Sequence, residues 1–187
     1  GWDGKGYFYD PMCGSGTIAI EAALFAQKIP AGFYRKEWGF MNWKSFEPLL
    51  WDEIVAESIE EVDPSDFKII ASDVSAQAIR IARKNLAKSR MMKTIVLKQS
   101  SFDSLRPESD NGILIFNPPY NVRLPLEDII DFYKSIGNHL KHNFKGHDAW
   151  IISSDVTAIK NIGLKASKKY QLYNGPLEAR FHKFSSY

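Results

Sequence analysis

Short apolar runs alternate with longer amphipathic segments along the chain. Five runs have the length of buried strands, at 7–9, 68–73, 94–98, 112–116 and 149–154. Helical patterns separate most of them, at 18–26, 75–88 and 126–140. In the helix at 75–88 the pattern predicts an inner face made of Ala78, Ile81, Ala82 and Leu86. Strands that alternate with helices favour an α/β fold with a mostly parallel sheet covered on both faces.

Two segments depart from this alternation. Residues 33–66 are rich in aromatic side chains and are predicted to be an insertion with one helix, from Phe46 to Glu61. Near the end of the chain, apolar and polar residues alternate from Leu177 to His182, just after the turn residues Asn174-Gly175-Pro176. This second pattern predicts a hairpin that adds an antiparallel edge to the sheet.

The composition fits one folded domain over residues 1–187. The chain is 44% hydrophobic and has 12 Phe, 8 Tyr and 5 Trp, enough apolar surface to exclude disorder. No apolar run approaches the length of a membrane span, and the N-terminus lacks a secretory signal pattern. The one cysteine, Cys13, excludes a disulfide framework and is compatible with a reducing compartment, so we expect a cytoplasmic protein. The net charge of +2 does not by itself indicate a nucleic-acid partner, and nothing in the sequence predicts the oligomeric state.

Four predicted strands end in residues suited to a ligand site. These ends are Asp10 to Gly16, Asp73, Asp103, and Asn117 to Tyr120. In an open parallel sheet, ligands bind outside the carboxyl ends of the strands. The sequence therefore predicts that these four ends form one binding site.

The glycine-rich turn has more than one interpretation. Gly14-Ser15-Gly16-Thr17-Ile18-Ala19 fits the dinucleotide pattern of nicotinamide-dependent oxidoreductases. That pattern expects an acid about 20 residues later, whereas Asp73 lies much farther along the chain. A tight strand-to-helix turn without a ligand is the other alternative.

The double proline is more specific. Consecutive prolines cannot lie inside a paired central strand, so Asn117-Pro118-Pro119-Tyr120 is predicted to form a rigid loop at a strand end. Such a loop fixes the Asn117 side-chain oxygen and the Pro118 carbonyl as two acceptors for a planar amine. Tyr120 offers a flat face on which a base could stack.

These motifs resemble those of a known family. Asp10-Pro11-Met12-Cys13-Gly14-Ser15-Gly16-Thr17, followed by Ile20-Glu21-Ala22-Ala23, is similar to the first motif of class I S-adenosylmethionine-dependent methyltransferases, and Asn117 to Tyr120 is similar to their amino-methyltransferase signature. With Trp38-Gly39-Phe40, the chain resembles the THUMP-associated RNA guanine-N2 methyltransferases, a family often labelled N6-adenine-specific DNA methylase. The resemblance implies a Rossmann-like, mostly parallel seven-stranded sheet. The N-terminal RNA-binding domain of that family does not precede Gly1 in this sequence, which suggests a fragment.

The resemblance also implies roles for individual residues. Backbone at the first motif would approach the methionine part of the cofactor, Asp73 would accept from the ribose hydroxyls, and Asp103 would accept from the adenine amine beside Phe102. The implied cofactor-binding set is Asp10, Pro11, Cys13, Gly14, Ser15, Gly16, Asp73, Val74, Phe102, Asp103 and Asn117. The implied catalytic set is Asn117, Pro118, Pro119 and Tyr120.

The implied reaction transfers a methyl group to an exocyclic amine, leaves S-adenosylhomocysteine and uses no metal. Guanine N2 of ribosomal RNA is the first choice of substrate. Adenine N6 in DNA or RNA and a protein glutamine amide remain alternatives, as does a non-catalytic RNA-binding module.

Several other features have plainer interpretations. Cys13 is expected to line the pocket without acting as a nucleophile, and His139 and His142 are expected to be solvated. The aromatic residues between 33 and 51 are expected to pack in a core. A basic run without acids, from Arg80 to Lys98, is typical of a solvated helix face, whereas Lys160, Lys165, Lys168 and Lys169 are expected nearer RNA phosphates.

Overall fold

A computed structural model describes residues 1–30, 32–58, 66–119 and 126–185, and places seven strands in one sheet. The strands are β1 (Gly6–Asp10), β2 (Phe67–Asp73), β3 (Ile95–Gln99), β4 (Gly112–Phe116), β5 (His147–Ser153), β6 (Ala166–Asn174) and β7 (Leu177–Ser185). Their order across the sheet is β3-β2-β1-β4-β5-β7-β6. The first five strands are parallel, and β7 pairs antiparallel with both β5 and β6. The predicted seven-stranded, mostly parallel sheet with a C-terminal hairpin is confirmed.

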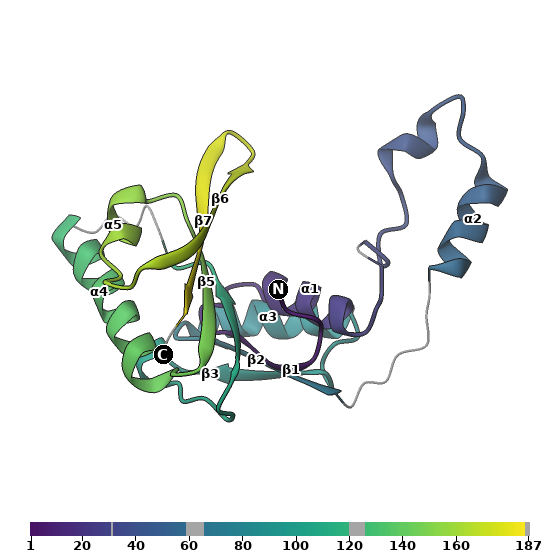
Figure 1. Cartoon of the computed structure of the whole chain (residues 1–187). Coiled ribbons are helices and arrows are strands. Elements are labelled where there is room, and N and C mark those ends of the chain that lie inside the picture. The colour runs from purple at the N-terminus through teal and green to yellow at the C-terminus, as the bar shows by residue number, and fades with distance from the viewer. Residues whose placement is uncertain (31, 59–65, 120–125, 186–187) are drawn as a thin grey trace.

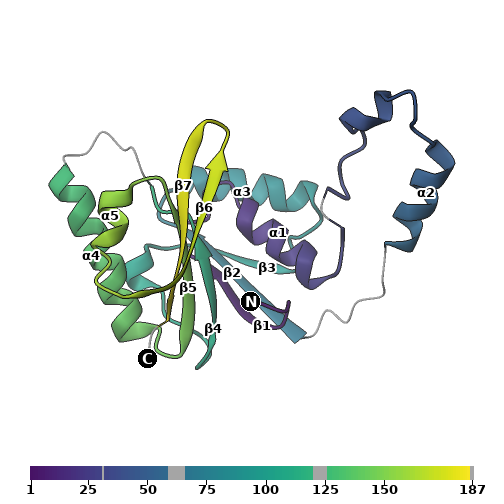
Figure 2. The same ribbon diagram turned by 45° about the horizontal axis from the view of Figure 1, so that its top comes forward.

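Helices cover both faces of the sheet (Figures 1 and 2). One face is covered by α1 (Thr17–Ala26) and α3 (Ala76–Lys88), and the other by α4 (Leu126–Asn143) and α5 (Val156–Lys160). A short 3-10 turn, η3 (Phe102–Ser104), follows β3 and contacts α4. From β1 the chain adds β2 and β3 on one side and then β4 and β5 on the other, so the topological switch point lies between β1 and β4. In such sheets ligands bind at the carboxyl ends of the strands beside the switch point.

Successive residues of the central strands supply two separate cores. Phe8, Ile69 and Ile113 pack with α1 and α3, while their neighbours Tyr9, Ile70 and Leu114 pack with α4 and α5. The alternation follows from the two-residue period of a strand. Because both faces are covered, neighbouring positions are buried and the strands read as continuous apolar runs.

The helix α3 corrects one sequence prediction. Its buried residues are Ile79, Ala82 and Leu86, whereas Ile81 is 44% exposed and Ala78 is half-buried. Positions 79, 82 and 86 follow the three- and four-residue spacing of one helix face. The prediction that Ile81 lies on the inner face was therefore wrong, whereas Ala82 and Leu86 lie there as predicted.

The insertion between α1 and β2 forms its own small structure. It contains a 3-10 turn, η1 (Gly39–Asn42), and α2 (Pro48–Glu57), which is shorter than the predicted helix; 59–65 lie outside the described residues. Phe40 is the centre of an aromatic cluster, with ring centroids 5.0 Å from Trp51 and 5.9 Å from both Trp38 and Phe46. None of the described residues of η1 or α2 is buried, and both elements stand away from the sheet in Figures 1 and 2. The expectation that these aromatic side chains pack in a core was wrong, because they pack on one another in an outlying cluster.

Among the described residues, no helix combines the length and the hydropathy that crossing a bilayer requires.

Candidate cofactor and amine-binding site

The loop after β1 is held by backbone hydrogen bonds to the neighbouring strand and by a tight turn. Cys13 N–H donates to the Ser72 carbonyl at 2.9 Å, and Gly16 N–H donates to the Cys13 carbonyl at 2.7 Å. Gly16 has a φ of 83°, and a Cβ there would lie 3.1 Å from Leu86 Cδ1 of α3. A glycine at this position therefore tolerates the left-handed backbone and leaves room for the close approach of α3.

Asp73 joins the ends of β1 and β2. Its Oδ2 accepts a hydrogen bond from Gly14 N–H at 3.0 Å, and its Oδ1 accepts from Ser75 N–H at 2.9 Å. The Asp73 carbonyl also accepts from Ser100 N–H at 3.0 Å, which connects the end of β3. The three adjacent strand ends thus form one connected edge, and each carboxylate oxygen of Asp73 keeps a lone pair for a ligand.

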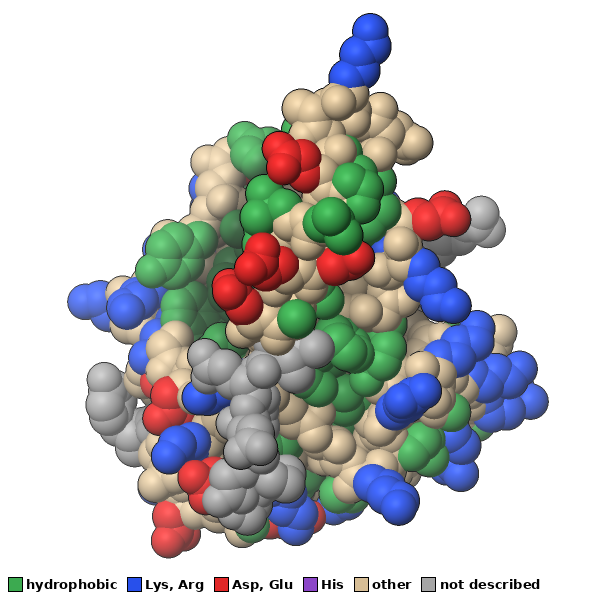
Figure 3. Space-filling view, turned by 90° about the vertical axis from the view of Figure 1, so that its right-hand side faces the viewer, with side chains coloured by type: hydrophobic (Ala, Val, Ile, Leu, Met, Phe, Trp, Pro, Cys, Tyr) green, Lys and Arg blue, Asp and Glu red, His purple; other side chains and the backbone are tan. Residues whose placement is uncertain are grey.

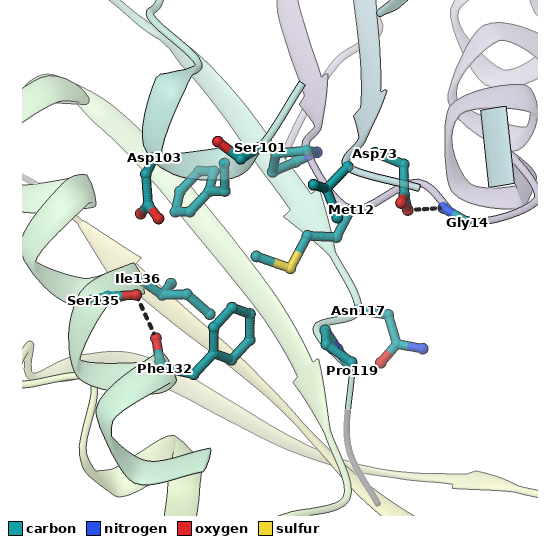
Figure 4. Close-up of a pocket in the computed structure, with 13 residues that line it drawn as sticks. Met12, Gly14, Asp73, Ser101, Asp103, Asn117, Pro119, Phe132, Ser135 and Ile136 are labelled. Atoms are coloured by element: carbon teal, nitrogen blue, oxygen red, sulfur yellow. Dashed lines mark hydrogen bonds between the residues drawn. The ribbon is translucent and has the colours of Figure 1, made fainter. Parts of the chain in front are cut away.

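A cavity of about 490 Å³ opens above these strand ends (Figure 4). Its volume lies within the usual range for small-molecule sites. The loops after β1, β2, β3 and β4 all line it, and α4 closes one side. The lining residues are Pro11, Met12, Gly14, Asp73, Val74, Ser101, Phe102, Asp103, Asn117, Pro119, Phe132, Ser135 and Ile136.

Most of the residues proposed from the sequence meet at this cavity. Eight of them line it, from all four strand ends: Pro11, Gly14, Asp73, Val74, Phe102, Asp103, Asn117 and Pro119. Five others do not line it, namely Asp10, Cys13, Ser15, Gly16 and Pro118. Tyr120 lies outside the described residues. Of the five, Asp10, Cys13 and Pro118 are buried beneath the lining, and Ser15 and Gly16 shape the turn.

Five lining residues were missed by the prediction. Met12 and Ser101 belong to strand-end loops, and Figure 4 shows the Met12 side chain reaching between Phe132 and Asp103. Phe132, Ser135 and Ile136 come from one face of α4, at the three- and four-residue spacing of a helix. That spacing, in the first helix after the double proline, was the signal that could have identified them.

Asn117 presents an unused acceptor. Its Oδ1 is buried and has no hydrogen-bond partner among the described residues. Buried polar atoms in folded proteins are nearly always paired, so an orphan acceptor in a cavity wall indicates a ligand donor. The following residue, Pro118, is buried, whereas Pro119 is exposed on the cavity.

Asp10 is a buried carboxyl beneath the glycine loop. It is 0% exposed, and neither of its oxygens has a hydrogen-bond partner in the described part of the chain. Burial, and to a smaller degree the charge of Asp73, raise its pKa to about 8; the backbone amides of Ala19 and Met12 approach it without well-aligned hydrogen bonds and oppose this only in part. Burial, with Asp10 and Asp73 adding to it, raises the pKa of the Cys13 thiol to about 12. Cys13 is therefore a neutral thiol at physiological pH, which does not suit a nucleophile. It is buried and does not line the cavity, in contrast to the sequence expectation.

His139 is buried rather than solvated, which corrects the sequence interpretation. Its Nε2 lies 3.0 Å from the Leu105 carbonyl and its Nδ1 lies 3.2 Å from Asn143 Nδ2, so Nε2 donates and Nδ1 accepts. Burial lowers its pKa, and its ring packs edge-on against Phe102 at 4.7 Å. His139 thus holds Phe102 and η3 in place below the cavity. Within the described ranges, no group of histidine, cysteine and carboxylate side chains is arranged to hold a metal ion.

Comparison with known proteins identifies the family to which the chain belongs. The profile of the family described as "RMKL-like, methyltransferase domain" matches residues 1–183. The chain belongs to this methyltransferase family. A protein of Legionella pneumophila named "Ribosomal RNA large subunit methyltransferase K/L" is 33% identical over 180 residues, which are 95% of this chain and 26% of the relative.

Solved structures with the same fold are also similar to this chain in sequence. The crystal structure of SMU.472 complexed with S-adenosylhomocysteine superimposes with a TM-score of 0.86 at 30% identity, covering 100% of this chain and 49% of that one. A structure from Listeria monocytogenes, described as a predicted N6-adenine-specific DNA methylase, has a TM-score of 0.77 at 27% identity, covering 96% and 46%. The chain thus spans about a quarter of the Legionella relative and about half of these solved chains.

Proposed function

We propose that the cavity binds S-adenosylmethionine and that the chain acts as one catalytic domain which methylates an exocyclic amine. The observation that carries the proposal is the convergence of eight expected residues, from four strand ends, on one cavity of about 490 Å³. The chemistry of the lining fits this cofactor. Asp73 offers carboxylate lone pairs for ribose hydroxyls, Phe102 and Ile136 offer apolar surface for the adenine, and Asp103 is an exposed acceptor for its amine.

The glycine loop would hold the methionine part of the cofactor. Gly14 lines the cavity, has a φ of 52°, and has no atom within 4 Å of the position of a Cβ. Backbone at Gly14 is therefore open to a ligand on the side where a side chain would project. Asp10 is buried beneath this loop and its pKa is raised to about 8, so it would become a carboxylate only when a ligand with positive groups binds nearby and favours the charged form.

Asn117 and Pro118 would orient the amine. Bound S-adenosylmethionine supplies an electrophilic methyl group on a sulfonium. The Asn117 Oδ1 and the Pro118 carbonyl would accept the two N–H groups of a planar amine and so direct its nitrogen lone pair. The N–C bond forms as the C–S bond breaks, neutral S-adenosylhomocysteine leaves, and the amine loses one proton to solvent. Positioning accounts for most of the rate, so neither a metal nor a covalent intermediate is required.

The substrate we propose is RNA, with guanine N2 of ribosomal RNA as the amine. The names of relatives such as the Legionella enzyme favour ribosomal RNA over DNA and protein. The choice of guanine N2 as the methylated amine rests on the resemblance of the motifs to those of guanine-N2 methyltransferases. A cytoplasmic location accompanies an RNA substrate of this kind.

Two measurements test the proposal. Titration calorimetry with S-adenosylmethionine and S-adenosylhomocysteine should give micromolar affinity, and absence of binding would reject the cofactor. Methyl-labelled cofactor, ribosomal RNA and nucleoside analysis should then place the label in N2-methylguanosine. Label in N6-methyladenosine would reject the guanine assignment while keeping the reaction class, and NAD binding more tightly than S-adenosylmethionine would favour an oxidoreductase.

A further inference from the structure

The outward side of α3 carries a concentrated positive charge. Arg80, Arg83, Lys84 and Lys88 are all exposed, and three of them line a surface depression of about 550 Å³ together with Gln77, Ile81 and Ala87. We call these four cations the α3 basic face. They extend along about 12 Å of helix, and Arg90 and Lys93 follow in the turn after it.

No carboxylate among the described residues forms an ion pair with this face. Residues 74–102 contain seven Lys and Arg and no Asp or Glu, while the remainder of the chain has 17 basic and 22 acidic residues. In the part of the chain that the structure describes, none of the four cations has an ion-pair or hydrogen-bond partner. By contrast, Lys98 in the same segment is paired with Glu108 at 2.8 Å. Four like charges within one helix repel one another, so a face of this kind gains most from an anionic partner.

The helix that carries this face begins beside the cavity and is attached to the glycine loop. The N-cap of α3 is Ser75, which directly follows the cavity-lining residues Asp73 and Val74. Along the helix, Asn85 Nδ2 donates to the Ser15 carbonyl of the glycine loop at 2.9 Å, and Leu86 packs against Gly16. In Figure 3 several Lys and Arg side chains lie close together at the lower right of the view, and others are scattered at its left, bottom and top.

The hairpin lysines offer a weaker positive surface. Lys168 lies opposite Lys183, which is already paired with Asp148 at 2.7 Å, and Arg180 on the same hairpin is paired with Glu178. Carboxylates thus neutralise part of the surface around Lys168 and Lys169. The sequence favoured the lysines of this region as phosphate contacts and interpreted the run on α3 as a solvated face; the neighbouring carboxylates lead us to argue for α3 instead.

We propose that the α3 basic face binds the sugar-phosphate backbone of the RNA whose base enters the cavity. The inference rests on the proposed function, because it assigns a contact to the RNA substrate. The ligand chemistry is a flexible polyanion with regularly spaced phosphates, which four unpaired cations on one side of a helix can follow. The α3 basic face does not distinguish one base from another. It positions the RNA strand and raises the affinity for RNA.

The test compares two triple variants that remove the same charge. The α3 variant, Arg80→Gln/Arg83→Gln/Lys84→Gln, removes three of the four positive charges of the face. The control variant, Lys36→Gln/Lys44→Gln/Lys145→Gln, removes three exposed lysines elsewhere that have no ion-pair partner in the described residues. Binding of protein-free large-subunit ribosomal RNA is measured at several salt concentrations, with a DNA duplex as a second probe. Methyl transfer gives KM for RNA and kcat, and calorimetry gives the S-adenosylmethionine affinity.

The expected result separates the two variants. The α3 variant should lower the slope of log K against log salt by about 2, because each lost phosphate contact removes about 0.7 on single-stranded RNA. Its KM for RNA should rise about tenfold, while kcat at saturating RNA and cofactor affinity stay at the wild-type value. The control variant should change the slope by less than half as much.

Three outcomes would overturn the proposal. Equal slope changes in both variants would indicate a response to net charge alone, and an unchanged slope in the α3 variant would show that RNA does not contact the face. A loss of binding confined to the DNA duplex would assign the face to DNA. If the wild-type protein binds S-adenosylmethionine but neither binds nor labels RNA, the RNA substrate itself fails, a result distinct from normal RNA methylation by the α3 variant.

Discussion

Asp73 Oδ2 accepts the Gly14 backbone amide at 3.0 Å across 59 residues of sequence. The bond fixes the glycine loop of β1 against the end of β2, and both residues line the cavity. The carboxylate sets the loop conformation and, under the proposed function, would also bind the ribose of the cofactor. Its two tasks can be separated by substitution.

Replacing Asp73 with alanine should abolish most cofactor binding. Two hydrogen bonds from ribose hydroxyls to a charged acceptor are lost and the Gly14 amide is left unpaired, which together should weaken S-adenosylmethionine about 100-fold or more. Asp73→Asn keeps a neutral acceptor for Gly14 and should lose less. Titration calorimetry measures both, with Asp52→Ala at an exposed position of α2 as the control. Unchanged affinity in Asp73→Ala would place the ribose elsewhere.

Gly16 offers a test of the turn that does not depend on any ligand. An alanine there must adopt a φ of 83° and place its Cβ 3.1 Å from Leu86, so Gly16→Ala should destabilise the fold by roughly 1–3 kcal/mol. Gly39→Ala is the matched control, because Gly39 has an ordinary φ and open space around its Cβ position. Urea denaturation compares the two. Equal stability losses would mean that the strain at Gly16 is absent in solution.

The sequence predicted the elements well because each depends on local pattern. The five parallel strands are continuous apolar runs, and the turn residues around Gly175 predict the hairpin in which β6 pairs with β7. The strand ends were also predictable, since their polar residues have no place in a buried strand. The convergence of these ends on one edge followed from the parallel order of the strands.

Other features depended on contacts between distant residues. His139 continues the helix face of Phe132 and Ile136, but the residues that bury it, Leu105 and Phe102, are far away in sequence. The aromatic insertion has the composition of a core segment, and only the tertiary structure shows that Phe40 gathers its own cluster. Likewise, the α3 basic face differs from an ordinary solvated helix only by what surrounds it.

Asp10 should make stability fall as the pH rises. Its native pKa of about 8 lies far above that of an unfolded aspartate, so between about pH 4 and pH 8 the folded state binds a proton that the unfolded state has released. The free energy of unfolding should therefore decrease with pH, by at most about 1.4 kcal/mol per pH unit from this one group. Asp10→Asn should show a flatter profile and gain stability relative to wild type near pH 8.

Urea denaturation at about pH 5.5 and about pH 8 measures the effect on stability. The exposed Asp52 of α2 provides the control, since Asp52→Asn should leave the wild-type pH dependence intact. A pH dependence in Asp10→Asn as steep as that of wild type would show that the buried carboxyl titrates normally.

Asn117 should affect catalysis without affecting the fold. Its Oδ1 has no hydrogen-bond partner in the described structure, so Asn117→Ala removes a buried, unpaired acceptor and should cost little stability. In methyl transfer the same atom would orient the amine, and its loss should lower kcat by about 100- to 1,000-fold, as for other single oriented groups. S-adenosylmethionine affinity, measured by calorimetry, should change far less than kcat. An Asn117→Ala protein that retains kcat would show that the amine is held by other groups and would remove Asn117 from the proposed mechanism.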